Sequence, residues 1–278
     1  MINKTILVPI DFSKPSKKAL EIAAKLAKKI DAKLLIMNAW QQKTELSNSA
    51  EHKDLQAKIK EAEENSRDKF AALKESMQLL KEVDQTFVVR HAFPQDAIIS
   101  MTSIYDIDLI IMGTSGAKSS KGVLIGNNSY AIAKNVKCPV LVIPKDTDIS
   151  RIFTSIGLAG DYKKTPSRET FRILTQIAMA YNADIHVVHV SKSPVINPDE
   201  ITEAKKLDRY LKELNHNFSF KFDTDLDEGL NEHIEEKKIG LLALVKKRKE
   251  SVDHIFSCSN TEKYSNLCKV PFLILNTT

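Results

Sequence analysis

The chain has 278 residues, of which 42% are hydrophobic and 28% charged, and its net charge at pH 7 is +5. This length supplies two hydrophobic cores of ordinary domain size, and no apolar run approaches the roughly 18 residues that span a bilayer. The N-terminus has a strand pattern where a secretory leader would have an apolar core. Three cysteines without metal-ligand spacing suit a reducing compartment, so we expect a cytoplasmic protein. A small, dispersed positive charge argues against nucleic-acid binding.

Strand and helix patterns alternate along the first half of the chain. Strands are predicted at residues 6–10, 33–40, 86–91, 108–112 and 140–143. Helices are predicted after Pro15, along a longer segment, and after Pro94. The apolar stripe of the longer segment comprises Leu55, Ile59, Ala62, Phe70, Leu73, Met77 and Leu80. Because its outer face alternates charges without a sustained heptad partner, we expect it to pack on its own sheet rather than in a coiled coil.

The second half repeats this order. Strands are predicted at 152–158, 184–190, 218–222, 240–245 and 272–275, with helices at 168–181, 199–214 and 227–237. Both halves begin with a strand that ends in an aspartate and an aromatic, and the closing runs 137–143 and 269–275 superpose at an offset of 132 residues. The chain is therefore predicted to contain two tandem domains, 1–146 and 151–278, each with a parallel sheet wrapped by helices.

A glycine-spaced loop follows the strand at 108–112. Gly113-Thr114-Ser115-Gly116 is separated by nine residues from Gly126-Asn127-Asn128-Ser129, where a helix is expected to begin. Glycines just past a strand, followed by a helix N-terminus, allow backbone N–H groups to close on a phosphate. The same offset of 132 places Val245, Arg248 and Cys258 where the three glycines stand, so we predict no nucleotide in the second domain.

Together these features resemble the universal stress protein domain, here in tandem. The resemblance rests on the strand ending at Asp11, the run from Asp108 to Gly116, the third glycine, and the closing run from Cys138 to Pro144. It implies two three-layer α/β/α domains, each with a five-stranded, mostly parallel sheet of the adenine nucleotide alpha hydrolase-like kind. It also implies that the final strands, 140–143 and 272–275, pair antiparallel and make one chain a pseudo-dimer, and that two chains could form a homodimer.

The resemblance further implies ATP or AMP, with or without Mg²⁺, held by the first domain. The nucleotide-binding residues would be Pro9, Asp11, Ala39, Met112, Gly113, Thr114, Ser115, Gly116, Gly126, Asn127, Asn128 and Ser129. Asp11 would accept a hydrogen bond from adenine or ribose, although an Asx-type cap on the next helix explains it as well. The family's ATP-binding branch has Ser or Thr where Asn127 stands, but an amide can also donate to phosphate.

The sequence offers no catalytic constellation. His186 and His189 lie three apart on a strand and should face opposite ways, Ser115 lacks a general base, and no Walker lysine follows the glycines. We therefore expect a nucleotide-binding module with at most slow ATP hydrolysis, acting in stress response with an unknown protein partner. The alternative is a ligand-free interaction protein. The run Lys246–Lys249 could hold an anion, but a solvated loop is the commoner explanation.

Overall fold

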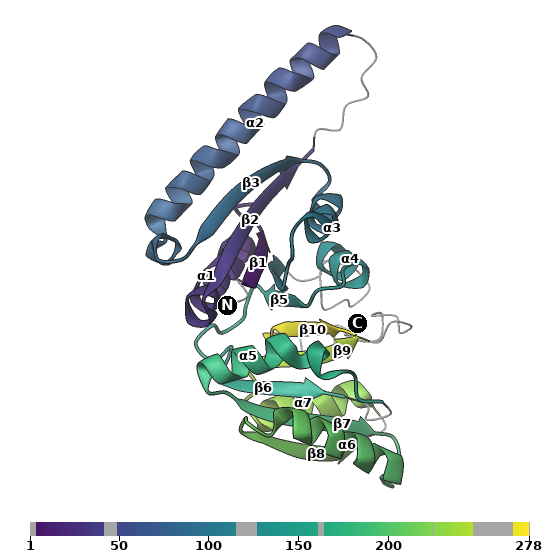
Figure 1. The fold of residues 1–278 in the computed structure, drawn as a ribbon. Helices are drawn as coiled ribbons and strands as arrows, with labels where there is room; N and C mark the ends of the chain where they lie inside the picture. The colour runs from purple at the N-terminus through teal and green to yellow at the C-terminus, as the bar shows by residue number, and fades with distance from the viewer. Residues whose placement is uncertain are drawn as a thin grey trace. The chain divides into compact units, whose positions relative to one another are not determined.

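The computed structural model describes residues 4–41, 49–114, 127–160, 164–223, 225–246 and 269–277. The chain divides into two compact units, Met1–Met112 and Gly113–Thr278. Strands alternate with helices in both (Figure 1), which confirms the predicted α/β class. None of the helices in the described ranges combines the length and the apolar character that crossing a bilayer requires.

The first unit is built on parallel strands in the order β3-β2-β1-β4. Its strands are β1 (Lys4–Pro9), β2 (Ala32–Trp40), β3 (Gln85–His91) and β4 (Leu109–Thr114), the last two residues of which fall in the second unit. Its helices are α1 (Lys14–Ile30), α2 (Ser49–Ser76), the 3-10 helix η1 (Gln78–Lys81) and α3 (Pro94–Ile104). The central strands are buried on both faces, as parallel strands covered by helices require.

Helix α1 begins and ends on local signals. The Ser13 side chain accepts a hydrogen bond from the backbone N–H of Ser16, Pro15 follows in the first turn, and Asp31 ends the helix with a left-handed φ of 53°. The N–H groups in the first turn of a helix have no partner within the helix. An N-cap side-chain oxygen accepts a hydrogen bond from one of them, and a proline in the first turn has no N–H to be left unpaired. The start predicted from Pro15 is therefore confirmed.

The second unit continues with α4 (Asn127–Asn135), β5 (Val140–Pro144) and β6 (Ser155–Ala159). The next elements are the 3-10 helix η2 (Arg168–Phe171), α5 (Arg172–Tyr181), β7 (Asp184–Ser191) and α6 (Pro198–Leu211). The last are β8 (His216–Phe222), α7 (Leu226–Glu236), β9 (Leu241–Lys246) and β10 (Phe272–Asn276). The strand order is β5-β10-β9-β6-β7-β8.

Strands β5 and β10 form an antiparallel pair within this unit. Phe272 lies opposite Val142, and Ile274 lies opposite Val140. Every residue of both strands is buried. The antiparallel meeting of the two closing strands is therefore observed as predicted, while all other strand pairs described in this unit are parallel.

Several boundaries differ from expectation, and three of them bear on the site or on the division of the chain. Strand β6 starts at Ser155 rather than residue 152, because Thr154 N–H donates to the Arg151 carbonyl and closes a turn. Strand β4 runs through Thr114, so Gly113 and Thr114 are strand residues rather than loop residues. The compact units divide after Met112, because β5 pairs with β10 and so belongs with the second unit. The domain limits 1–146 and 151–278 stay a prediction.

Helix α2 is much longer than the strand on which it packs. Its 28 residues extend about 42 Å, whereas the 7 residues of β3 extend about 23 Å, and Figure 1 shows the helix running past the sheet. The Phe70 ring stacks on Phe87 with centroids 4.2 Å apart. Leu55 and Ile59, on the predicted apolar stripe, are only half-buried. The stripe therefore packs on the sheet only in its C-terminal part.

We expect Phe70→Ala to lower the free energy of unfolding by about 3 kcal/mol, because it removes a buried, stacked ring. Leu55→Ala, on the overhanging part of the same helix, should cost less than about 1 kcal/mol. Urea unfolding followed by circular dichroism compares the two. Equal losses would show that the overhang is packed as firmly as the end that covers β3.

Candidate functional site

Three predicted site residues lie at one edge of the first unit's sheet. Pro9 is the last residue of β1, Ala39 is the penultimate residue of β2, and Met112 lies near the end of β4. Strand β1 pairs in parallel with both neighbours, so the carboxyl ends of all three strands share this edge. The strand order also reverses here, with β2 on one side of β1 and β4 on the other, and such switch points are where open α/β sheets bind ligands.

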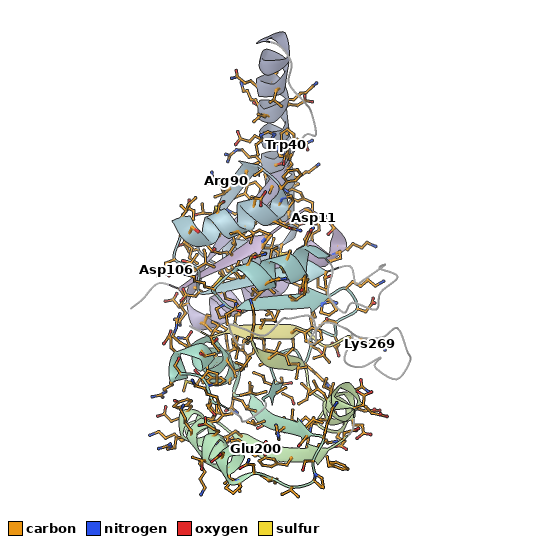
Figure 2. The ribbon with its side chains drawn as sticks, turned by 90° about the vertical axis from the view of Figure 1, so that its right-hand side faces the viewer. Asp11, Trp40, Arg90, Asp106, Glu200 and Lys269 are labelled. Carbon is orange, nitrogen blue, oxygen red and sulfur yellow. The ribbon has the colours of Figure 1, made fainter. Side chains whose placement is uncertain are left out.

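Asp11 follows this edge directly and is exposed (Figure 2). Its Oδ1 accepts a hydrogen bond from the backbone N–H of Ser13 at 3.0 Å, which forms the Asx-type cap expected from the sequence. Partial desolvation raises the pKa of the Asp11 carboxyl, but hydrogen bonds from Ser13 and Ser16 outweigh it and hold the pKa below its usual value. The side chain is therefore a preoriented carboxylate at neutral pH.

The next residue, Phe12, has a left-handed φ of 63°. Such a conformation is uncommon for a bulky side chain and costs roughly 1 kcal/mol or more. The Lys69 ammonium of α2 lies 6.0 Å from the centroid of the Phe12 ring. The chain leaving β1 is thus turned sharply beside Asp11, and a lysine of α2 lies near this turn.

The remaining predicted residues fall in the second unit or outside the described ranges. Thr114 and Ser129 are buried, Gly113 is half-buried, and Asn128 is exposed near the start of α4. Outside the described residues lie Ser115, Gly116, Gly126 and the side chain of Asn127. The structure therefore brings together Pro9, Ala39 and Met112, with Asp11 beside them, and the glycine loop stays a sequence prediction.

The sequence interpretation missed the buried polar residue next to this edge, Asn38. Asn38 of β2 donates from Nδ2 to the Ile10 carbonyl at 2.6 Å, and its Oδ1 accepts from the Ser66 hydroxyl of α2 at 2.9 Å. It ties the end of β1 to β2 and to α2, immediately before Asp11. Asparagine is depleted in strands, so its place inside an apolar strand was the available signal.

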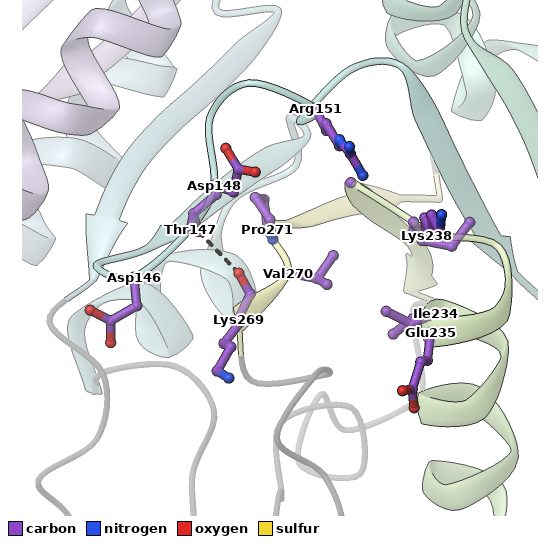
Figure 3. Close-up of a pocket in the computed structure, with 12 residues that line it drawn as sticks. Asp146, Thr147, Asp148, Arg151, Ile234, Glu235, Lys238, Lys269, Val270 and Pro271 are labelled. Carbon is purple, nitrogen blue, oxygen red and sulfur yellow. Dashed lines mark hydrogen bonds between the residues drawn. The ribbon is translucent and has the colours of Figure 1, made fainter.

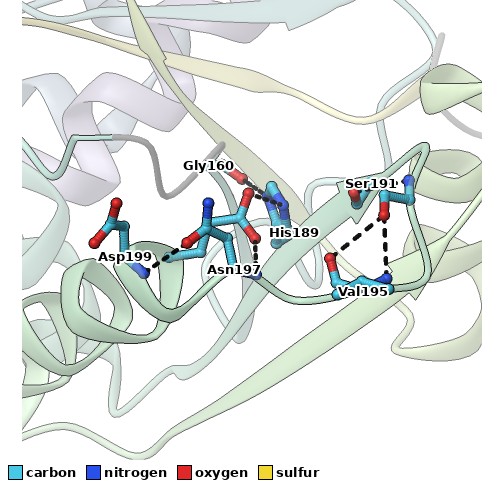
Figure 4. Close-up of polar contacts among 8 residues, drawn as sticks. Gly160, His189, Ser191, Val195, Asn197 and Asp199 are labelled. Carbon is cyan, nitrogen blue, oxygen red and sulfur yellow. Dashed lines mark hydrogen bonds and ion pairs between the residues drawn. The ribbon is translucent and has the colours of Figure 1, made fainter.

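His189 forms the corresponding link in the second unit. Its Nδ1 lies 2.9 Å from the Gly160 carbonyl, just beyond β6, as Figure 4 shows. Its Nε2 lies 3.7 Å from Glu200 of α6. Asn38 and His189 occupy equivalent positions in the two repeats, since Ile10 N–H donates to the Met37 carbonyl and Gly160 N–H donates to the Val188 carbonyl. Both repeats therefore join the first strand's end to the second strand and the following helix through one polar side chain.

Lys246 has a structural role instead of the anion-binding role considered for the basic run. Its Nζ donates to the carbonyls of Ala133 at 2.8 Å and Lys134 at 2.7 Å, near the C-terminus of α4. Burial lowers the pKa of this ammonium, and Lys134 adds to the effect. Lys247 to Lys249 lie outside the described residues, as do Asp161 and Cys258.

His233 of α7 is fully buried, and neither ring nitrogen has a hydrogen-bond partner among the residues that the structure describes. Burial is the main reason that its pKa falls to about 4, with Lys221 and His186 adding to the shift. The His186 ring centroid lies 6.3 Å away, and its Nδ1 faces Asn217. In the part of the chain that the structure describes, no group of three or more potential ligand side chains could hold a metal ion.

Comparisons with known proteins agree with one another. Residues 3–144 match the family described as "Universal stress protein family". The chain is 27% identical over 156 residues to a universal stress protein of Methanocaldococcus jannaschii, covering 51% of this chain and 82% of that protein. It is also 27% identical over 156 residues to universal stress protein YxiE of Bacillus subtilis, covering 51% and 99%. A crystal structure of a universal stress protein from Archaeoglobus fulgidus covers 99% of both chains, with a TM-score of 0.69 and 17% identity, and so shares the fold along the whole length.

We expect Lys246→Met to lower the free energy of unfolding by about 1–3 kcal/mol, because two helix-terminal carbonyls lose their charged donor while the apolar stem is kept. Lys137→Met, at an exposed lysine of the same unit, is the matched control and should change stability by less than about 0.5 kcal/mol. Thermal and urea unfolding measure both. A loss no larger for Lys246→Met than for the control would contradict this role.

His233 should make the protein sensitive to mild acid. Its pKa is about 4 in the folded protein against 6.5 as the ordinary value, so the unfolded chain binds more protons in this window. Stability therefore falls as pH falls from about 6.5 to 4, by roughly 3 kcal/mol in all. His233→Leu should flatten this dependence in urea unfolding at pH 7, 5.5 and 4.5. The same slope in the variant would rule out His233 as its source.

Proposed function

Because the chain belongs to the universal stress protein family, we propose that it is an adenine-nucleotide-binding protein of the stress response. ATP or AMP, with or without Mg²⁺, would occupy the first domain. The observation that carries this proposal is the position of Pro9, Ala39 and Met112 at the carboxyl ends of three adjacent parallel strands. That edge is the usual ligand site of an open α/β sheet.

Each part of the nucleotide would have a suitable partner. The half-buried Pro9 and Ala39 would offer apolar surface to adenine, with the buried Met112 on the neighbouring strand, and the Asp11 carboxylate would offer an acceptor to an amino group or a ribose hydroxyl. The glycine loop from Gly113 to Gly126 would let backbone N–H groups approach the phosphates, and α4 starts directly after it at Asn127. The Asn127 amide would donate where the family's binding branch has a hydroxyl.

The second domain would have another role. Its counterparts of the three glycines carry side chains, and Lys246 is already bound to α4. We propose that this domain pairs with the first through β5 and β10 as an internal pseudo-dimer, and that nucleotide occupancy changes how the protein meets a protein partner in the cytoplasm. No general base was found beside the glycine loop in the sequence, so any ATP hydrolysis would be slow.

The test is isothermal titration of nucleotide-stripped protein with ATP and AMP. We expect one site per chain, about tenfold weaker binding in Asp11→Asn, which keeps the Ser13 acceptor but removes the charge, and no binding in Gly116→Arg. Asp106→Asn is the matched control, because Asp106 is exposed at the opposite end of the same sheet (Figure 2).

Two results would contradict the proposal. One is a loss of affinity in Asp106→Asn as large as that in Asp11→Asn. The other is no heat with either nucleotide together with an empty protein in native mass spectrometry. The second result would favour the ligand-free interaction protein, with Asn127 marking the lost site.

A further inference from the structure

A cavity lies within the second unit, where two strands of its sheet begin. It measures about 310 Å³ and is bordered by the segment that follows β5, the end of α7, and the residues that lead into β9 and β10 (Figure 3). Since β9 and β10 begin here, the cavity lies at the amino ends of these strands. It is therefore separate from the carboxyl-edge site proposed for the nucleotide.

The cavity combines an apolar floor with a charged rim. Its floor contains the buried residues Ile234, Ile239, Val270 and Pro271. Its rim carries three exposed cations, Arg151, Lys238 and Lys269. Among the described residues none of these cations forms an ion pair or a side-chain hydrogen bond.

Three carboxylates, Asp146, Asp148 and Glu235, also line the cavity, but none of them forms an ion pair with these cations in the part of the chain that the structure describes. The Asp148 carboxylate accepts hydrogen bonds from the backbone N–H of Ser150 at 2.9 Å and from its hydroxyl at 2.7 Å. The Asp146 carboxylate lies 3.8 Å from Lys145. The lining thus holds as many carboxylates as cations, but the carboxylates have other partners, which leaves the cations available to a ligand.

Two close contacts hold the walls in place without a ligand. The Thr147 hydroxyl donates to the Lys269 carbonyl at 3.1 Å, which fixes the segment after β5 against the entry to β10. A Cβ at Gly240 would meet the Arg151 carbonyl oxygen at 2.0 Å, so only glycine lets the backbone of Arg151 lie here. Preformed walls reduce the ordering cost of binding.

We propose that this cavity binds a small organic anion, a carboxylate or phosphate with a compact apolar body. The apolar part would cover Ile234, Ile239 and Val270, and the anionic group would meet Arg151 and Lys238 on the rim. A volume near the lower end of the range for ligand pockets limits the ligand to a small molecule.

A substitution at Lys238 can distinguish a role in ligand binding from a role in stability. It has a left-handed φ of 50°, and the next N–H, of Ile239, returns to the Ile234 carbonyl at 3.0 Å. This is the helix-ending position at which glycine is preferred. Lys238→Gly should therefore raise the Tm by about 2 °C while it removes a rim cation.

The experiment uses the full chain with ¹³C-labelled isoleucine methyl groups, because Ile234 and Ile239 both line the cavity. Phenyl phosphate and benzoate are the probes, with inorganic phosphate and benzyl alcohol as controls for charge alone and apolar surface alone. We expect at least one aromatic anion to shift both methyl signals saturably at submillimolar concentration. Affinity should fall at least fivefold in Lys238→Gly and in Arg151→Gln. It should not change in Lys237→Gln, where an exposed lysine beside the cavity loses the same charge.

The proposal is overturned if neither aromatic anion shifts these methyl signals up to 10 mM, or if inorganic phosphate binds as well as phenyl phosphate. It is also overturned if Lys237→Gln weakens binding as much as Lys238→Gly. Because the probes contain no adenine and the variants lie in the second unit, these outcomes do not depend on whether the first domain binds ATP.

Discussion

The antiparallel pair of β5 and β10 is the interaction on which the second unit depends. Both strands are buried along their whole length, so each would expose an apolar edge if the other were absent. Polar contacts reinforce the pair: Asn276 donates from Nδ2 to the Cys138 carbonyl at 2.8 Å, and Lys246 holds the end of α4. Closing strands from two sequence repeats are thereby joined in one core, which explains why the compact units do not divide at the repeat boundary.

Polar side chains at the carboxyl ends of the parallel strands either bind the backbone or stay exposed to a ligand. At the carboxyl edge of the first unit, Asn38 satisfies the Ile10 carbonyl and leaves the following Asp11 exposed and preoriented. His189 satisfies the Gly160 carbonyl in the second unit and lies near Glu200, whose other oxygen accepts from the N–H of Asn197. The backbone carbonyl just after the first strand therefore contacts an amide side chain in one repeat and, in the other, an imidazole that lies near a carboxylate. The first repeat alone kept the glycine spacing that suits a phosphate.

The two edges would serve different ligands because their backbones and charges differ. A carboxyl edge followed by glycines and a helix N-terminus presents N–H groups, which suits phosphates. The amino ends of β9 and β10 are bordered by the segment after β5, and the lining there combines an apolar floor with cations that form no ion pair among the described residues. Gly240 has a steric role at this edge, since its missing Cβ leaves room for the Arg151 carbonyl. Glycine would thus have separate uses in the two repeats.

Local pattern sufficed for much of the fold and for the strand-end positions of three candidate site residues. Apolar periodicity and caps such as Ser13 act between near neighbours, so strands, helices, the duplication and the strand-end position of Pro9, Ala39 and Met112 could be predicted from the sequence. Contacts between residues far apart in the sequence could not be predicted in this way. Lys246 contacts α4 from 113 residues away, and Asn38 accepts a hydrogen bond from Ser66 of α2, 28 residues along the chain. The buried ring of His233 has no hydrogen-bond partner among the described residues. Sequence by itself determined which elements form, while only the tertiary structure decided which polar groups are occupied, because that depends on the neighbours that packing brings together.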